Sequence, residues 1–146
     1  MKVTILAVDK LRERYLRDGC AFYQEKLKRY VPVTFAEVKA GTKATEARLL
    51  LARIESGSAV WALDREGAML SSRDLARKLH LLQTIGTRRL TLLFGGADGL
   101  DETCLARADF RWSLSPLTFL HEMSRLIALE QLFRAAKINR GEPYHR

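Results

Sequence analysis

The chain has 146 residues, of which 47% are hydrophobic and 29% are charged, and 25 Lys and Arg against 17 Asp and Glu give it a net charge of +8. These values are typical of one soluble globular domain spanning residues 1–146, and no apolar run approaches the roughly 20 residues that a membrane span needs. The basic excess favours a polyanionic partner, because each neutralised phosphate releases counterions. A merely basic soluble protein is the alternative.

The first ten residues indicate a strand and not a targeting segment. The apolar run after Lys2 is too short for a signal peptide, and no small-residue cleavage site follows it. We therefore expect a cytoplasmic protein. Cys20 and Cys104 lack the spacing of metal ligands, so we expect two reduced, packed thiols and no metal site.

The first third of the chain alternates strand and helix patterns. Residues 3–8 are rich in Val, Ile and Leu and predict a strand, and residues 11–30 then place apolar side chains at helical spacing until Pro32. Residues 33–38 predict a second strand. Residues 44–54 have the Ala, Leu, Arg and Glu content of a helix.

The middle of the chain repeats this alternation. Residues 59–63 predict a buried strand that enters a turn over residues 64–67. Ser71 or Ser72 then caps a helix over residues 74–85, which Gly86 ends.

The next predicted strand, residues 90–94, runs straight into the turn Gly95-Gly96-Ala97-Asp98-Gly99. Such a junction brings bare backbone groups within contact distance of a ligand at the carboxyl edge of an α/β sheet. The turn lacks the Gly-Lys-Ser/Thr ending of a phosphate loop. It is also not the G-x-G-x-x-G motif of a first strand, which disfavours NAD binding.

The last third predicts a short helix, a strand and a long helix. Asp101 looks like the N-cap of a helix that ends near Ala108, and residues 110–114 predict a fifth strand. The closing helix covers residues 122–138, and its apolar side chains form more than one narrow stripe, so we expect it to pack on two sides, one of which a second chain could supply. The whole pattern predicts a three-layer α/β domain with a mainly parallel sheet.

The candidate reactive side chains are few. We expect His80 to be structural or on the surface, and His121 to be structural and not a catalyst. The chain closes on Tyr144-His145-Arg146, which combine a stacking ring, a titratable imidazole and a guanidinium. A frayed terminus is the alternative. No Ser-His-Asp or paired-carboxylate arrangement supports hydrolysis.

Five segments, taken together, resemble the RlmH family of SPOUT-class methyltransferases. They are residues 2–8, 63–72, 94–100, 113–121 and 134–146. The resemblance covers essentially the whole chain, and it rests on the order and spacing of the segments more than on any one motif. Two positions depart from the family: Leu120 stands where proline is usual, and Asp9 replaces a common glycine.

The RlmH family transfers a methyl group from S-adenosylmethionine to N3 of a pseudouridine in large-subunit ribosomal RNA. The resemblance implies a SPOUT-type trefoil-knotted domain, an exception to the rule against knots. It also implies a homodimer, with the RNA met within the ribosome as partner.

The resemblance also implies the site residues. By motif, the S-adenosylmethionine pocket would be lined by Leu63, Gly95, Leu114, Ser115, Pro116, Leu117, Thr118 and Phe119. Backbone groups there would read the adenine, while Leu63, Leu117 and Phe119 would supply apolar walls. We expect Gly95→Val to abolish cofactor binding and to leave the fold largely intact.

Tyr144, His145 and Arg146 match the family's catalytic tail beside the acceptor base. Positioning supplies most of the rate of a direct displacement, but N3 must also lose its proton. His145 or Tyr144 would take that proton, or Arg146 would stabilise the developing anion. Arg125 and Arg134 are secondary candidates for RNA contact.

Two other classes of function compete with this interpretation. A non-catalytic, ribosome-associated RNA-binding protein of the same fold would show no affinity for S-adenosylmethionine. A dinucleotide-dependent enzyme would bind NAD and not RNA.

Overall fold

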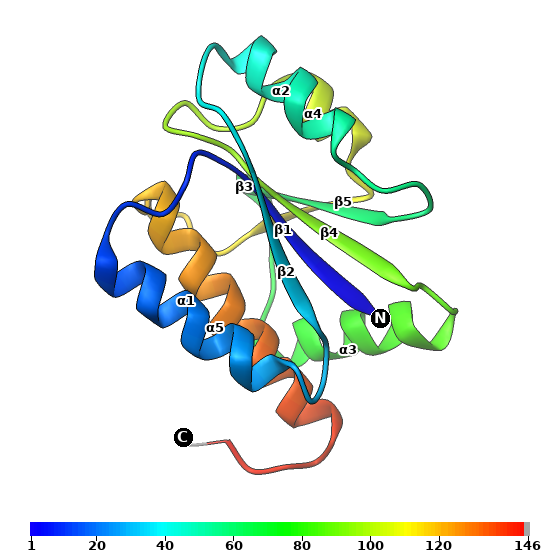
Figure 1. The fold of residues 1–146 in the computed structure, drawn as a ribbon. Coiled ribbons are helices and arrows are strands. Elements are labelled where there is room, and N and C mark those ends of the chain that lie inside the picture. Colours follow the sequence, from blue (N-terminus) through cyan, green and yellow to red (C-terminus); the bar gives the residue numbers. More distant parts are fainter. Residues whose placement is uncertain (145–146) are drawn as a thin grey trace.

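A single five-stranded sheet forms the centre of the computed structural model, which describes residues 1–144. All strand pairs are parallel, in the order β2-β1-β4-β3-β5 (Figure 1). The strands are β1 (Lys2–Val8), β2 (Val33–Val38), β3 (Ala59–Met69), β4 (Arg89–Phe94) and β5 (Phe110–Ser113). The expected parallel α/β sheet is therefore confirmed.

Helices cover both faces of the sheet and complete the three expected layers. One layer contains α1 (Arg14–Leu27), α3 (Ser72–Thr84) and α5 (His121–Asn139). The other contains α2 (Lys43–Ala52) and α4 (Glu102–Arg107), at the top of Figure 1. Among residues 1–144, no helix is long and apolar enough to cross a membrane. The trefoil knot stays a prediction.

The sheet separates two apolar cores. β1 and β4 are central, and residues 5–8 and 90–94 are buried without a break, as expected for parallel strands covered on both faces. Alternate side chains serve opposite cores: Ile5 packs toward α1, α3 and α5, whereas Leu6 packs toward α2 and α4. Cys20 and Cys104 are buried free thiols, one in each core, as predicted.

The helix caps follow the sequence closely. The Ser71 hydroxyl accepts a hydrogen bond from the backbone N–H of Asp74 at 3.1 Å and caps α3. The carboxylate of Asp101 accepts from the N–H of Thr103 at 3.0 Å and caps α4. These two caps are at predicted residues, and α3 begins at Ser72, two residues before the predicted start.

The predicted turn over residues 64–67 is wrong. β3 continues through it to Met69 and pairs with β5 twice, with a shift in register between Leu63 and Ala68. Arg111 on β5 stabilises this bulge, because its Nε donates to the Asp64 carboxylate at 2.8 Å. A Cβ at Gly67 would lie 2.4 Å from the Arg111 carbonyl oxygen, so the close pairing requires glycine there.

α5 packs on two sides, but both sides belong to the same chain. It lies between α1 and α3 against the sheet, as Figure 1 shows. A Cβ at Gly19 would lie 2.9 Å from Leu126, so glycine permits the close approach of α1 to α5. The width of the apolar surface of α5 therefore gives no argument for a second chain.

Candidate active site

A cleft of about 720 Å³ lies where several strands end. It is bounded by the extension of β3, the glycine turn after β4, the loop over residues 114–120 and the start of α5. Because all strands are parallel, the loops after their carboxyl ends meet at one edge of the sheet, in the upper half of Figure 1. The predicted ligand-binding edge therefore carries a cleft.

The glycine turn is held by its own backbone. The N–H of Gly99 donates to the carbonyl of Gly96 at 3.1 Å, and Gly99 has a φ of +79°. A Cβ at Gly95 would lie 2.5 Å from the carbonyl carbon of Gly99 and 2.8 Å from the nitrogen of Leu100. The expectation that Gly95→Val leaves the fold intact is therefore wrong, because the first atom of a side chain collides with the turn itself.

Seven of the eight residues expected around the cofactor line this cleft: Leu63, Gly95, Leu114, Ser115, Leu117, Thr118 and Phe119. Pro116 is in the same loop, but it is exposed and does not line the cleft. The loop is held by short-range bonds, since the N–H of Leu117 donates to the Ser115 hydroxyl at 3.0 Å. The Leu117 side chain is 69% exposed, so it presents an apolar surface at the cleft.

Sequence patterns missed the charged lining of the cleft. Lys43, Arg65 and Arg111 are its cations, and the carboxylates are Asp64, Glu66, Asp98 and Glu102. Arg65 donates to the Thr118 hydroxyl and thereby joins the β3 extension to the loop. Asp64, Arg65, Glu66 and Asp98 lie in segments that resemble the family, but the local pattern over residues 64–67 was that of a turn, and no motif assigned these side chains to the site. The cleft has no excess of positive charge.

The first turn of α5 has one face on the cleft and one in the core. His121 and Ser124 line the cleft, whereas Glu122 and Arg125 are 5% and 1% exposed. Arg125 donates to the carbonyl of Val8 at 2.6 Å, and its Nε is buried with no hydrogen-bond partner among the described residues. Burial lowers the pKa of its guanidinium, against the charges of Glu37 and Glu122.

The burial of Arg125 contradicts its assignment as an RNA contact. Glu122 acts beside it: one carboxylate oxygen accepts from the backbone N–H of Arg12 and from that of Glu13, the latter at 3.3 Å. Both side chains therefore attach the start of α5 to the β1–α1 connection. His80 is on the exposed surface of α3, as predicted.

The two departures from the family fit the backbone. Asp9 has a φ of +65°, a left-handed conformation in which glycine is the least strained residue. Its carboxylate compensates by accepting from the N–H of Lys10 at 2.9 Å and from the Arg12 guanidinium at 2.8 Å. Leu120 is the N-cap of α5 with a φ of −54°, which is a proline-compatible value.

Tyr144 does not line the cleft. Its ring packs edge-on against Phe133 at 5.1 Å, its hydroxyl donates to Glu130 at 3.2 Å, and the Arg134 guanidinium lies 4.3 Å from the ring centre. Burial is the main cause that raises the pKa of Tyr144. Hydrogen bonding with Tyr23 and the charge of Glu130 raise it further. The phenol is therefore a donor in this position. His145 and Arg146 lie outside the described residues.

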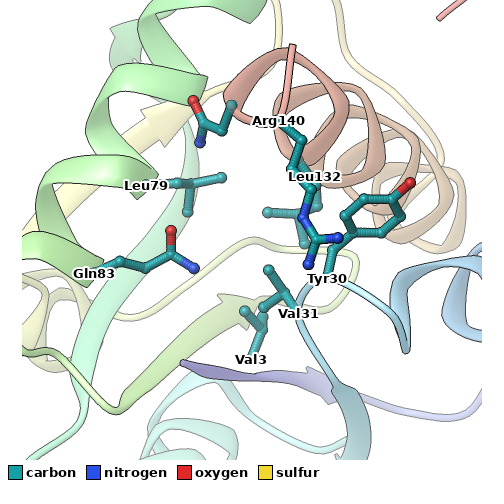
Figure 2. Close-up of a pocket in the computed structure, with 9 residues that line it drawn as sticks. Val3, Tyr30, Val31, Leu79, Gln83, Leu132 and Arg140 are labelled. Carbon is teal, nitrogen blue, oxygen red and sulfur yellow. The ribbon is translucent and has the colours of Figure 1, made fainter. Parts of the chain in front are cut away.

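A second, smaller hollow of about 110 Å³ opens at the other edge of the sheet. Val3, Val31, Leu79 and Leu132 form its apolar part, and Tyr30, Gln83 and Arg140 surround them (Figure 2). It shares no lining residue with the cleft.

Comparison with known proteins agrees with this architecture. The family described as "Predicted SPOUT methyltransferase" matches residues 1–145. The ribosomal RNA large subunit methyltransferase H of Acetivibrio thermocellus is 40% identical, with 100% of both chains covered. Its counterpart in Pelotomaculum thermopropionicum is 42% identical, with 98% of each chain covered.

Solved structures show the same fold at low identity. A probable methylase family protein from Haemophilus influenzae has a TM-score of 0.60 at 9% identity, covering 99% of this chain and 70% of its own. The SpoU methyltransferase AviRb from Streptomyces viridochromogenes, solved in complex with AdoMet, has a TM-score of 0.51 at 13% identity. The match covers 97% of this chain and 59% of AviRb. With the family model and the full-length relatives, the cleft and the parallel sheet lead to one assignment: the chain belongs to the SPOUT methyltransferase family, in the RlmH group.

Proposed function

We propose that this protein transfers a methyl group from S-adenosylmethionine to N3 of a pseudouridine in large-subunit ribosomal RNA. The observation that carries the proposal is the cleft at the carboxyl edge, in a chain that aligns over its full length with relatives named ribosomal RNA large subunit methyltransferase H. A ribosomal substrate implies work in the cytoplasm.

The residues of the cleft fit this cofactor. Its volume of about 720 Å³ is within the range of small-molecule sites. Leu63, Leu117 and Phe119 would enclose the adenine, and the bare backbone at Gly95 would approach it closely. The cofactor supplies an electrophilic methyl group on a cationic sulfonium.

The charge of the cleft separates this cofactor from a dinucleotide. Four carboxylates against three cations suit a cationic sulfonium and offer no clear site for an anionic pyrophosphate. This balance supports S-adenosylmethionine over NAD.

We further propose that the protein is a homodimer in which the tail of one chain acts in the cleft of the other. Tyr144 contacts Phe133, which is nine positions, or about 14 Å of helix, from Ser124, the nearest residue of α5 that lines the cleft. Two further residues span at most about 7 Å of backbone, which is shorter than this distance and supports the cleft of a second copy as the place where the tail acts. Tyr15 and Phe22 on α1 are 58% and 54% exposed and offer an apolar surface for a second copy.

The first experiment deletes residues 144–146. We expect the rate of methyl transfer to ribosomal RNA to fall at least a hundredfold. Mass spectrometry of the RNA measures this rate. Calorimetry should show S-adenosylmethionine binding within about twofold of wild type, because the cleft is complete without the tail. Normal methylation by the truncated protein would show the tail to be a frayed terminus. A wild-type protein with no affinity for the cofactor would favour the non-catalytic RNA-binding alternative.

The second experiment tests the shared site by mixing two inactive variants. The tail deletion keeps a cleft, and Leu117→Glu keeps a tail but changes the exposed apolar wall of the cleft. Random mixing should restore about a quarter of the wild-type activity, because half of the dimers are mixed and each holds one complete site. No recovery would place the tail in its own chain's cleft. Sedimentation as a monomer at micromolar concentration would exclude the dimer.

A further inference from the structure

The edge of the sheet opposite the cleft gathers basic side chains. In a parallel sheet all strands begin at one edge, and the helices that connect them end there. This edge runs down the right side of Figure 1, from the end of α2 to the N-terminus and the ends of α3 and α5. We call it the amino-edge surface and define it by Lys2, Arg29, Arg53, Arg88 and Arg140.

A backbone hydrogen bond at the start of β1 joins two of these residues. Lys2 is opposite Arg89 in the β1–β4 ladder, and its N–H donates to the carbonyl of Arg88 at 2.9 Å. Arg140 is close to Arg29, since its guanidinium donates to the Arg29 carbonyl at 3.0 Å. These cations therefore form two pairs, Lys2 with Arg88 and Arg29 with Arg140, and the two pairs border the same small hollow through Val3 and Arg140.

None of these charges forms an ion pair with a described residue, although Arg140 interacts electrostatically with the Glu142 carboxylate. All five side chains are on exposed residues. Cations at helix ends complement the helix dipole, which accounts for Arg29, Arg53 and Arg140 without a ligand. Lys2 is the first residue of β1 and Arg88 precedes β4, so that explanation does not extend to them.

The cleft does not hold the positive charge of the chain. Its lining has three cations and four carboxylates, so the overall charge of +8 must be on other surfaces. A protein that binds a polyanion needs phosphate contacts for most of its affinity. The cleft is poorly suited to supply them.

The small hollow of Figure 2 opens on the same edge. The side chains of Gln83 and Arg140 point toward it. The side-chain amide of Gln83 makes no hydrogen bond to another described residue. Amide and guanidinium groups donate to phosphate and sugar oxygens without reading sequence. The edge thus combines exposed charge with neutral donors.

We propose that the amino-edge surface binds the phosphate backbone of the RNA substrate, away from the cleft. This inference rests on the proposed function, because it takes RNA as the partner. Arg140 is the C-cap of α5 at this edge, four residues before Tyr144, so a phosphate-binding surface here would lie close in sequence to the tail. Affinity would then come from one edge of the sheet and chemistry from the other.

The test compares two triple variants with the same loss of charge. Lys2→Ala, Arg29→Ala and Arg88→Ala remove the amino-edge surface. Lys39→Ala, Arg48→Ala and Arg73→Ala, the matched control, remove three exposed cations that form no ion pair among the described residues and line neither cavity. The affinity of each for a ribosomal RNA fragment with the acceptor site is measured from 50 to 200 mM salt.

We expect the amino-edge triple to reduce the slope of log K against log salt by about two and to weaken binding at 100 mM salt roughly 10- to 100-fold. The control triple should change affinity by less than about threefold. S-adenosylmethionine affinity, measured by calorimetry, should stay within twofold of wild type in both. A wild-type slope in the amino-edge triple, or an equal loss in the control, overturns the proposal.

Failure of the proposed function looks different. A wild-type protein that binds RNA through the amino edge but transfers no methyl group refutes the methyltransferase proposal and supports this one. A wild-type protein with no affinity for the RNA fragment or for the assembled ribosome overturns both.

Discussion

The two edges of the sheet differ in how they present polar groups. At the carboxyl edge, the cations of the cleft are matched by carboxylates, and Arg65 and Arg111 are bonded to Thr118 and Asp64. At the amino edge, Lys2 and Arg88 are exposed and unpaired within the part of the chain that the structure describes. A site that orients a small ligand needs fixed groups, whereas long-range attraction of a polyanion needs only accessible charge. The net charge of a sequence therefore does not locate its active site.

Gly95→Val gives the largest expected effect and tests whether the carboxyl edge depends on backbone geometry. S-adenosylmethionine affinity should fall more than a hundredfold, and the free energy of unfolding by roughly 1–3 kcal/mol, because the new Cβ collides with Gly99. Calorimetry and thermal denaturation measure the two changes. Gly41→Val is the control, since its Cβ would meet Thr45 at 3.8 Å, an ordinary contact. A Gly95→Val protein with wild-type stability and affinity would show that the turn adapts.

Two single arginine variants contrast a buried cation with an exposed one. Arg125→Ala should reduce the free energy of unfolding by about 2–4 kcal/mol, because it leaves a cavity and removes the donor to the Val8 carbonyl. It should leave the salt dependence of RNA binding unchanged. Arg29→Ala should do the reverse, with an unchanged melting temperature and a slope smaller by roughly 0.7–0.9. A reduced slope in Arg125→Ala would return Arg125 to the RNA interface.

Leu120→Pro gives the smallest expected effect and concerns the cofactor loop. Leu120 has a φ of −54°, and its N–H donates no hydrogen bond to another described residue, so proline fits without strain. Proline reduces the conformational entropy of the unfolded chain, so the free energy of unfolding should rise by about 0.4–1 kcal/mol. Thermal denaturation beside Leu120→Ala, for which no gain is expected, measures this. A fall in stability would mean that Phe119 cannot adopt the conformation required before proline.

Local patterns predicted most of the elements. The strand over residues 33–38 has the predicted bounds, and Ser71 and Asp101 cap the helices that they precede. Propensity, periodicity and capping act over a few residues, so a sequence alone displays them. The same reasoning failed at residues 64–67, because Asp64 is stabilised in a strand by Arg111, 47 positions further along the chain.

The candidate site was predicted in part for the same reason. The glycine turn and the loop over residues 114–119 are contiguous motifs, and the structure brings all of their expected residues except Pro116 to the cleft. Lys43 is in none of the family-like segments, and no pattern assigned a role to Arg65; both line the cleft because their segments reach the same edge of the sheet. Arginine is usually a surface residue, but Arg125 is 1% exposed.

The sequence by itself determined the order of strands and helices, the total charge and the family motifs, because each depends on residue type and short-range spacing. Only the tertiary structure decided that Arg125 is buried, that Tyr144 packs on Phe133 and not in the cleft, and that unpaired cations gather at the amino edge. Burial and electrostatic environment arise from contacts between residues distant in sequence, and these exist only once the sheet has formed.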